Sequence, residues 1–533
     1  MYDILIKNGQ IVDGSGAPAF YGDIAVQDGK IAKIAPGIEG EAQQVLDATG
    51  LQVTPGFIDT HSHSDNFVYT GSDCHNYLEQ GTTTQVAGQC GDSLAPYFDE
   101  LKNKLRLTEE QHALWSKTGA TPSTFMAAAE RAETGTNMAY FLGHAAVRGK
   151  VMGTSDAVPN GEQLREMQAY VVDAMEAGYL GLSTGLVYPP SVYGTTEELI
   201  ALSSVMAPYG GMYVSHVRGE GNNLLPAVRE AIRIGEEAGV PTFISHLKVM
   251  GDRNRGTSLQ LLREMDEAVA RGLDLYADQY PYTASSAPLY SQIPPKYLVG
   301  GVPVWLERLK SPEARQQILH SIFHEVDEYE SGIFHAGFDG TLITVARETP
   351  ELVNKSIGQI AREQGKEPID AMCDLLIANQ GVAQGMYFNI SVPDMLHIMA
   401  HPRVFCGSDT SNYRKRYDPE AVGGGHPRST GSMVRRLELV RDFRLRSMEE
   451  SVKNLTWDAA CALGLGNHGK LVEGWDANIT VLDYDKLHAS ADYVHPRRRN
   501  TGIHWVLVNG VVAVEDGASI PGVRAGKVLK RSR

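Results

Sequence analysis

The chain has 533 residues, of which 42% are hydrophobic, and it carries 48 Lys and Arg against 64 Asp and Glu. This length and apolar content supply a sizeable core, enough for several domains or for one large α/β barrel with an accessory part, and they exclude disorder as the default. The net charge of −16 argues against partners that need a basic surface, namely nucleic acid and anionic membranes.

The first residues, MYDILIKNGQIVDG, lack the cationic leader and apolar region of a signal peptide, and no run of about 18 apolar residues occurs elsewhere. We therefore expect a soluble, cytoplasmic protein. Its cysteines are scattered and odd in number, unlike a disulfide framework: Cys74, Cys90, Cys373, Cys406 and Cys461. A cysteine with a function is then a free thiol or a metal ligand.

Both ends of the chain have the pattern of short strands. Residues 1–54 contain alternating segments separated by turn residues, such as Asp28-Gly29, and residues 474–533 repeat this pattern with Asn509-Gly510 as a turn. Neither end is large enough to form a core alone. We predict that they pair into one small β-sandwich.

Between the two ends, apolar strand-like segments alternate with helix-like stretches. Near-continuous apolar segments between helices indicate a parallel sheet buried on both faces, and eight of them predict an α/β fold, a TIM-like (β/α)8 barrel over residues 55–473. The eight segments are 56–61, 82–88, 138–144, 179–184, 212–217, 242–249, 273–281 and 403–409.

The last two of these segments are separated by about 120 residues, far more than an ordinary βα connection needs. We predict an inserted subdomain between strands 7 and 8, at about residues 285–400. It includes the helix-like VWLERLKSPEARQQILHSIF (304–323) and would cover the mouth of the barrel.

In such a barrel the chemistry lies at the C-terminal ends of the strands. Six residues of metal-ligand type fall there: His61 and His63 on strand one, Cys90 on strand two, His216 on strand five, His246 on strand six and Asp409 on strand eight. Each has an ordinary explanation when taken alone, as a solvated loop, a core histidine, a small hydrophobe or a helix cap. Their coincidence at one end of one barrel favours a binuclear or near-binuclear metal site.

These residues carry a resemblance to a known family. GFIDTHSHSD (56–65) after a β-rich N-terminal part, the histidines of strands five and six, and the aspartate of strand eight resemble the amidohydrolase superfamily. Within it, the chain is most similar to the N-acyl-D-amino acid deacylases (D-aminoacylases), and the similarity covers essentially the whole chain. The motifs are AGQCGDSLAP (87–96), STGLVYPP (183–190), SHVRGEG (215–221), ISHLKV (244–249) and YPYTASS (280–286).

The resemblance implies a particular metal site. Many members of the superfamily bridge two metals with a carboxylated lysine on strand four, but residues 178–190 contain no lysine. A tight Zn²⁺ held by Cys90, His216 and His246 is implied instead, with a second, weaker divalent position at His61, His63 and Asp409. Three nitrogen or sulfur ligands leave the fourth zinc position open for water, as in catalytic sites.

The implied reaction is hydrolysis of the amide bond of N-acyl-D-amino acids, giving a carboxylate and a free D-amino acid. Metal-activated water would attack, with Asp409 as general base and acid, although a purely metal-binding role for Asp409 stays open. By resemblance, the substrate carboxylate is held by Tyr188, Lys248, Tyr280 and Ser286. A cation with hydroxyl donors suits a carboxylate, whereas a solvated Lys248 and tyrosines used for packing are the alternatives.

Other features of the sequence leave alternatives open. Deacylases usually have Gly after the strand-eight aspartate and Asn before the strand-two cysteine, where this chain has Thr410 and Gln89. The nearby basic cluster either favours an acidic substrate, such as N-acyl-D-glutamate or N-acyl-D-aspartate, or is simply solvated: Arg414, Lys415 and Arg416. Arg218 and Glu220 either orient His216 or form a surface ion pair.

Two other functions stay open. A cyclic-amide hydrolase of the dihydroorotase or hydantoinase kind would share the barrel and the histidines, but the missing strand-four lysine counts against it. A catalytically inactive metal-binding barrel is the other alternative, and the presence of all six ligand-type residues argues against that. The amino-acid side chain, the acyl group and the oligomeric state do not follow from the sequence.

Overall fold

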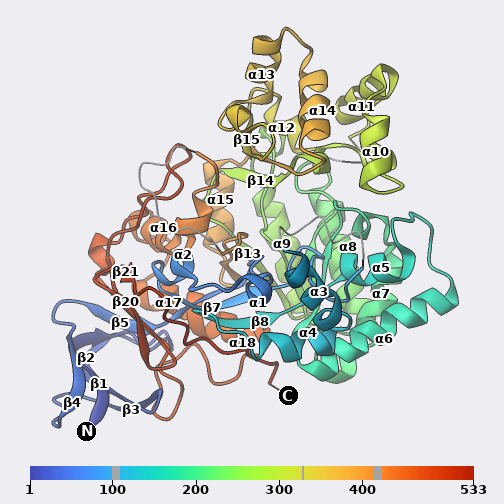
Figure 1. Ribbon diagram of the computed structural model, residues 1–533. Coiled ribbons are helices and arrows are strands. Elements are labelled where there is room, and N and C mark those ends of the chain that lie inside the picture. The colour runs from blue at the N-terminus through green and yellow to red at the C-terminus, as the bar shows by residue number, and fades with distance from the viewer. Residues whose placement is uncertain (99–107, 327–328, 330, 413–422, 533) are drawn as a thin grey trace.

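The computed structural model describes residues 1–98, 108–326, 329, 331–412 and 423–532. Strands from both ends of the chain form one nine-stranded sheet in the order β21-β20-β19-β18-β5-β1-β2-β3, with β4 paired to β1. The two parts meet where β5 pairs with β18, and Figure 1 shows these blue and red strands together at the lower left. The strands are β1 (Tyr2–Ile11), β2 (Phe20–Gln27), β3 (Lys30–Ala35), β4 (Ala42–Asp47), β5 (Gln52–Pro55), β18 (Ile479–Leu482), β19 (Ile503–Val508), β20 (Val511–Glu515) and β21 (Ala518–Ser519).

The two turns predicted from the sequence are present. Asp28 and Gly29 join β2 to β3 with φ values of 52° and 76°, and Asn509 and Gly510 join β19 to β20 with values of 48° and 81°. Two left-handed residues in succession are what a type I′ hairpin turn requires, which is why Asn-Gly and Asp-Gly are favoured there.

The middle of the chain forms the predicted barrel. The first three strands make one parallel sheet, β6-β7-β8, and the rest make a second sheet, β9-β10-β11-β12-β13-β17, in which β9 continues β8 past Phe141. The ring closes between β6 and β17, where the Thr60 amide donates to the Cys406 carbonyl and Ser62 pairs with Thr410. The strands are β6 (Phe57–Asp59), β7 (Thr82–Ala87), β8 (Asn137–Tyr140), β9 (Leu142–Gly143), β10 (Gly181–Gly185), β11 (Met212–His216), β12 (Thr242–Ile244), β13 (Leu275–Gln279) and β17 (Val404–Cys406).

Apolar side chains fill the barrel interior, including Ile58, Val86, Val214, Phe243 and Phe405. Because the interior is packed, small molecules have access to the strand ends only. The helices associated with the barrel are α1 (Phe67–Thr70), α2 (His75–Leu78), α3 (Glu109–Thr118), α4 (Pro122–Ala129), α5 (His144–Met152), α6 (Gly161–Ala177), α7 (Thr196–Ser204), α8 (Leu224–Ala238), α9 (Thr257–Ala270), α15 (Val392–Met399), α16 (Arg428–Asp442), α17 (Met448–Lys453) and α18 (Ala459–Leu463). None of the described helices combines the length and apolar character needed to cross a bilayer.

The insertion between the seventh and eighth strands lies above the barrel in Figure 1, drawn in yellow-green to gold. It has its own apolar core, to which Leu289, Trp305, Ile318 and Met372 belong. Its elements are β14 (Ala284–Pro288), α10 (Val302–Arg308), α11 (Pro312–His324), α12 (Gly332–Ala336), β15 (Thr341–Ala346), α13 (Ile357–Gln364), α14 (Pro368–Ala378) and β16 (Ala383–Phe388).

The helix-like segment 304–323 corresponds to α10 and α11, whereas the three antiparallel strands of the insertion add to the predicted content. The domain limits themselves, at 54/55 and 473/474 and at about 285–400 for the insertion, stay predictions.

Candidate metal centre

All six ligand-type residues lie at the C-terminal end of a barrel strand. His61 and His63 follow β6, Cys90 follows β7, His216 ends β11, His246 follows β12 and Asp409 follows β17. Because the strands of the barrel are parallel, their C-terminal ends lie at the same end of the barrel, and the six side chains gather there.

Three of these residues have an unusual backbone conformation. The φ values of Cys90, His246 and Asp409 are 53°, 36° and 52°, in the left-handed region that side chains with a Cβ rarely adopt. Each such residue costs about 1–3 kcal/mol, and residues of this kind cluster at functional sites. These three conformations occur at residues that directly follow barrel strands or lie within a few residues of their ends.

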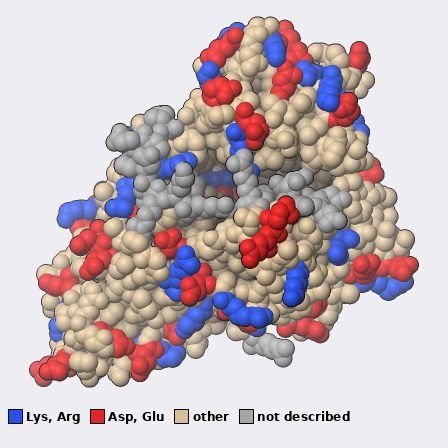
Figure 2. All heavy atoms as spheres, viewed as in Figure 1, with Lys and Arg blue, Asp and Glu red and all other residues tan. Residues whose placement is uncertain are grey.

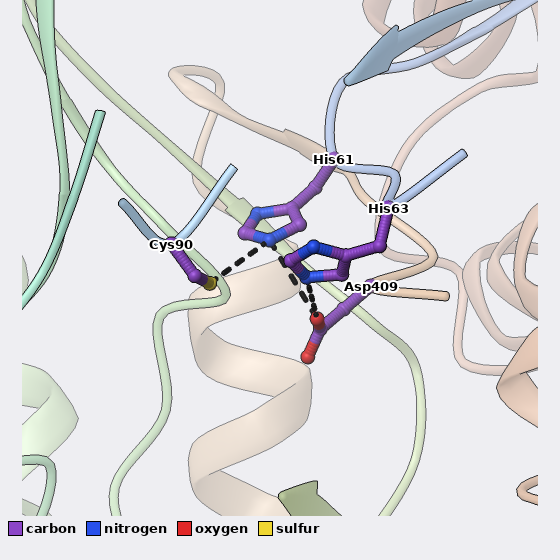
Figure 3. Close-up of side chains that lie close together, drawn as sticks. All are labelled: His61, His63, Cys90 and Asp409. Carbon is purple, nitrogen blue, oxygen red and sulfur yellow. Dashed lines mark hydrogen bonds and ion pairs between the residues drawn. The ribbon is translucent and has the colours of Figure 1, made fainter. Parts of the chain in front are cut away.

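The first group of ligand-type residues is shown in Figure 3. His61 Nε2 lies 3.4 Å from Cys90 Sγ and 3.6 Å from Asp409 Oδ1, and His63 Nε2 lies 3.1 Å from the same Asp409 oxygen. One ligand atom from each of the four residues lies within 4.8 Å of all the others. Four donors so close together are suited to surround one metal ion.

The second group shares Cys90. His246 Nε2 lies 3.3 Å from Cys90 Sγ, and the ligand atoms of Cys90, His216 and His246 lie within 4.8 Å of one another. All three residues are buried. The six candidate ligands therefore form two adjacent sets with the thiol between them.

The electrostatics favour the charged forms of the two anionic candidates. Burial opposes ionisation of the Cys90 thiol, but His61 and His246 hold its pKa well below the ordinary value. Burial likewise opposes ionisation of Asp409, but Arg428 and His63 hold the pKa of this carboxyl well below its usual range. A thiolate and a carboxylate are the forms in which these residues bind metals.

Charged partners surround the second group. Glu220 Oε1 lies 3.1 Å from His246 Nδ1 and forms an ion pair with Lys248 Nζ, while Glu220 Oε2 is 3.8 Å from His216 Nε2. Arg218 pairs instead with Glu230, 2.9 Å away, and with two main-chain carbonyls. Of the two residues considered for orienting His216, only Glu220 is next to the site, and its close histidine contact is to His246.

A cavity opens beside the two groups, between the barrel and the insertion, and Figure 2 shows the surface hollowed there. The barrel contributes His216, His246 and Asp409 to its wall, and the insertion contributes Ser291, Gln292, Tyr329 and Tyr387. The four residues predicted to bind substrate all line this cavity: Tyr188, Lys248, Tyr280 and Ser286.

The structure adds Arg428, which the sequence analysis did not single out. Its Nη1 lies 2.6 Å from Asp409 Oδ2, its guanidinium carbon lies 4.8 Å from the centre of the Tyr280 ring, and it is buried. The sequence does contain an imidazole and a cation close together, in His-Pro-Arg at 426–428. The contact with Asp409 could not be foreseen, since Arg428 comes from the start of α16 rather than from a strand end.

The residues that depart from the deacylase pattern have defined contacts. Thr410 Oγ1 lies 2.7 Å from Ser429 Oγ, and the Gln89 side-chain amide donates to the Thr60 carbonyl at 2.9 Å. Gln89 thus links the turns after strands one and two. The basic cluster of Arg414, Lys415 and Arg416 lies outside the described residues.

Comparisons with known proteins agree with the fold. The family model described as "Amidohydrolase family" matches residues 44–514. A D-aminoacylase from Alcaligenes xylosoxydans xylosoxydans is 32% identical, over 100% of this chain and 98% of the relative. An N-acyl-D-glutamate deacylase from the same organism is 30% identical, over 99% and 96%.

Solved structures give the same result. A crystal structure of D-aminoacylase matches with a TM-score of 0.81 and 31% identity, and the N-acyl-D-glutamate deacylase of Bordetella bronchiseptica, in complex with zinc and a phosphonate inhibitor, matches with 0.80 and 30%; both matches cover 100% of the two chains. The chain therefore belongs to the amidohydrolase family, and within it to the N-acyl-D-amino acid deacylases.

Proposed function

We propose that this protein is a zinc-dependent deacylase that hydrolyses the amide bond of N-acyl-D-amino acids and releases a carboxylate and a free D-amino acid. The observation that carries the proposal is the convergence of Cys90, His216 and His246 on one point, beside a cavity lined by Asp409 and Lys248. The preference for the D form rests on the similarity to D-aminoacylases.

The residues present fit a zinc ion. One thiol and two imidazoles are the donor types that zinc prefers, their ligand atoms lie within 4.8 Å of one another, and the cavity provides a route to the fourth position. His61, His63 and Asp409 would hold a second divalent ion more weakly. β10 (Gly181–Gly185) offers no lysine for the two positions, and Cys90, which belongs to both sets, would take the place of such a lysine.

When bound, zinc supplies a Lewis acid that polarises a carbonyl and lowers the pKa of an attached water. Asp409 supplies the proton transfers, because its carboxylate lies on the cavity wall and is held in the ionised form by Arg428. It would accept the proton of the attacking water and deliver it to the amide nitrogen, which must be protonated to leave.

The other end of the substrate carries a carboxylate. Lys248, Tyr188, Tyr280 and Ser286 line the cavity, and Arg428 lies over the Tyr280 ring. Lys248 is paired with Glu220 and Arg428 with Asp409. A bound carboxylate would therefore join existing charge networks, which places it in a defined orientation relative to Asp409.

No specific observation favours the cyclic-amide alternative. D-hydantoinase and related structures match at 16–19% identity with TM-scores of 0.53–0.57, which is a likeness of fold alone. An inactive metal-binding barrel is distinguished from an enzyme by the hydrolysis assay that follows.

The direct test is release of free amino acid from N-acetyl-D- and N-acetyl-L-amino acids with acidic, neutral and aromatic side chains. We expect D-selective hydrolysis and zinc near one per chain, and we expect Cys90→Ala to lose both, because the thiol is part of both ligand sets. Zinc-loaded protein that hydrolyses no member of the panel would contradict the proposal, and cyclic amides would then be assayed.

Asp409→Asn should lower kcat about 10²- to 10⁴-fold, the usual contribution of a general acid or base, because an amide cannot accept the proton of the attacking water. Zinc bound by Cys90, His216 and His246 should remain, as measured by metal analysis of the purified variant. Activity within threefold of the wild type, with zinc retained, would show that Asp409 carries no proton.

Tyr280→Phe should lower kcat/KM for N-acyl-D-amino acids about tenfold or more, because a hydrogen bond to a charged group contributes about 1.5–3 kcal/mol. Tyr282→Phe is the matched control: it makes the same chemical change two residues away, where the ring does not line the cavity, and it should stay within about twofold. Equal effects of the two substitutions, or an equal effect of Tyr280→Phe on a substrate without the carboxylate, would contradict the assignment.

A further inference from the structure

Asp278 is a buried carboxylate that contacts both ligand groups, and neither the motifs nor the cavity identifies it. It lies in β13, its side chain is 0% exposed, and it does not line the cavity. A group that substrate cannot reach but that contacts candidate ligands acts by holding them in place.

Each carboxylate oxygen contacts one ligand group. Asp278 Oδ2 lies 3.2 Å from His61 Nδ1 and 3.3 Å from the Thr60 hydroxyl, and Asp278 Oδ1 accepts a hydrogen bond from the His246 main-chain amide. His61 belongs to the first group, and His246 belongs to the second. One side chain therefore connects the ring of a ligand in one group to the backbone of a ligand in the other.

We propose that Asp278 is a positioning residue for the metal centre: it sets the tautomer of the His61 ring and the position of the His246 backbone. This proposal rests on the proposed metal site but not on the identity of the substrate. The carboxylate accepts a hydrogen bond from the protonated Nδ1 of His61. Nε2 then keeps its lone pair, and Nε2 faces Cys90 and Asp409. At His246, the same carboxylate holds an amide whose residue has the strained φ of 36°.

The surrounding backbone leaves room for this arrangement at one glycine. A Cβ on Gly407 would lie 2.5 Å from the Cβ of His61 and 2.9 Å from Asp278 Oδ2. Such contacts are well inside van der Waals distance, so a side chain at this position would separate the carboxylate from the imidazole. The glycine after β17 thus permits the contact between strands one and seven.

A second buried carboxylate provides an internal comparison. Asp59, also fully buried, accepts hydrogen bonds from the main-chain amides of His61 and Ser408, at 3.1 and 2.9 Å, but it does not contact the His61 ring. An amide oxygen can accept both bonds equally well. Asp59→Asn therefore changes a neighbouring carboxylate without affecting the tautomer of His61.

The test compares Asp278→Asn with Asp59→Asn. In the first variant the amide oxygen must face the His246 amide, so the NH₂ group faces His61 Nδ1 and drives the ring to the tautomer protonated on Nε2, in which Nε2 has no lone pair for a metal. Calorimetric titration with Zn²⁺ should show affinity at the His61, His63 and Asp409 position reduced about 10- to 100-fold, the range found for such outer partners. Zinc at Cys90, His216 and His246 should remain, and Asp59→Asn should match the wild type in both respects.

If Asp278→Asn fails to fold, or if the wild type takes up a single zinc, the tautomer of His61 is measured directly in the wild type. In metal-free protein labelled with ¹⁵N-histidine, at a pH where the His61 ring is neutral, the His61 signal, assigned with His61→Asn, should report its single proton on Nδ1. A neutral ring protonated on Nε2 instead, or a folded Asp278→Asn variant with both zinc affinities unchanged, would overturn the proposal. Neither readout depends on which amide the enzyme hydrolyses, so the proposal and the deacylase assignment can fail separately.

Discussion

The site depends on one buried thiol placed among three imidazoles. Cys90 Sγ lies 3.4 Å from His61 Nε2 and 3.3 Å from His246 Nε2, and it forms a set of ligand-type atoms with His216 and His246. A buried thiolate without a compensating charge is strongly unfavourable. The neighbouring imidazoles of His61 and His246 provide part of that compensation, and the proposed zinc would provide the rest. Cys90 itself has a left-handed backbone conformation.

Closure of the barrel brings candidate ligands from its first and last strands close together. His61 and Asp409 are brought together because β6 and β17 are the first and last strands of the ring, joined by hydrogen bonds from Thr60 to Cys406 and from Asp409 to His61. The insertion leaves the ring after β13 and contributes Ser291, Gln292 and Tyr387 to the cavity. Barrel residues thus carry the proposed chemistry, whereas residues of both parts line the cavity proposed for the substrate, which allows the barrel ligands to stay while the insertion varies.

The sequence was sufficient for the parts of the site that follow from chain order. Ligand-type residues at strand ends must converge once the strands are parallel, so His61, Cys90, His216, His246 and Asp409 could be predicted together. Arg428 and Asp278 could not. Arg428 comes from the start of a helix, and its contact with Asp409 depends on how the chain returns after a long loop. Asp278 lies within a strand, where a buried aspartate has no distinctive spacing, and its role depends on contacts across the ring.

The most direct test of the central claim is X-ray absorption at the zinc edge of the purified protein. If Cys90, His216 and His246 hold the tight zinc, the spectrum will contain one sulfur scatterer at about 2.3 Å together with imidazole nitrogens at about 2.0–2.1 Å. A zinc environment of nitrogen and oxygen only would contradict this account, because it would leave Cys90 outside the metal centre that the rest of the structure is built to support.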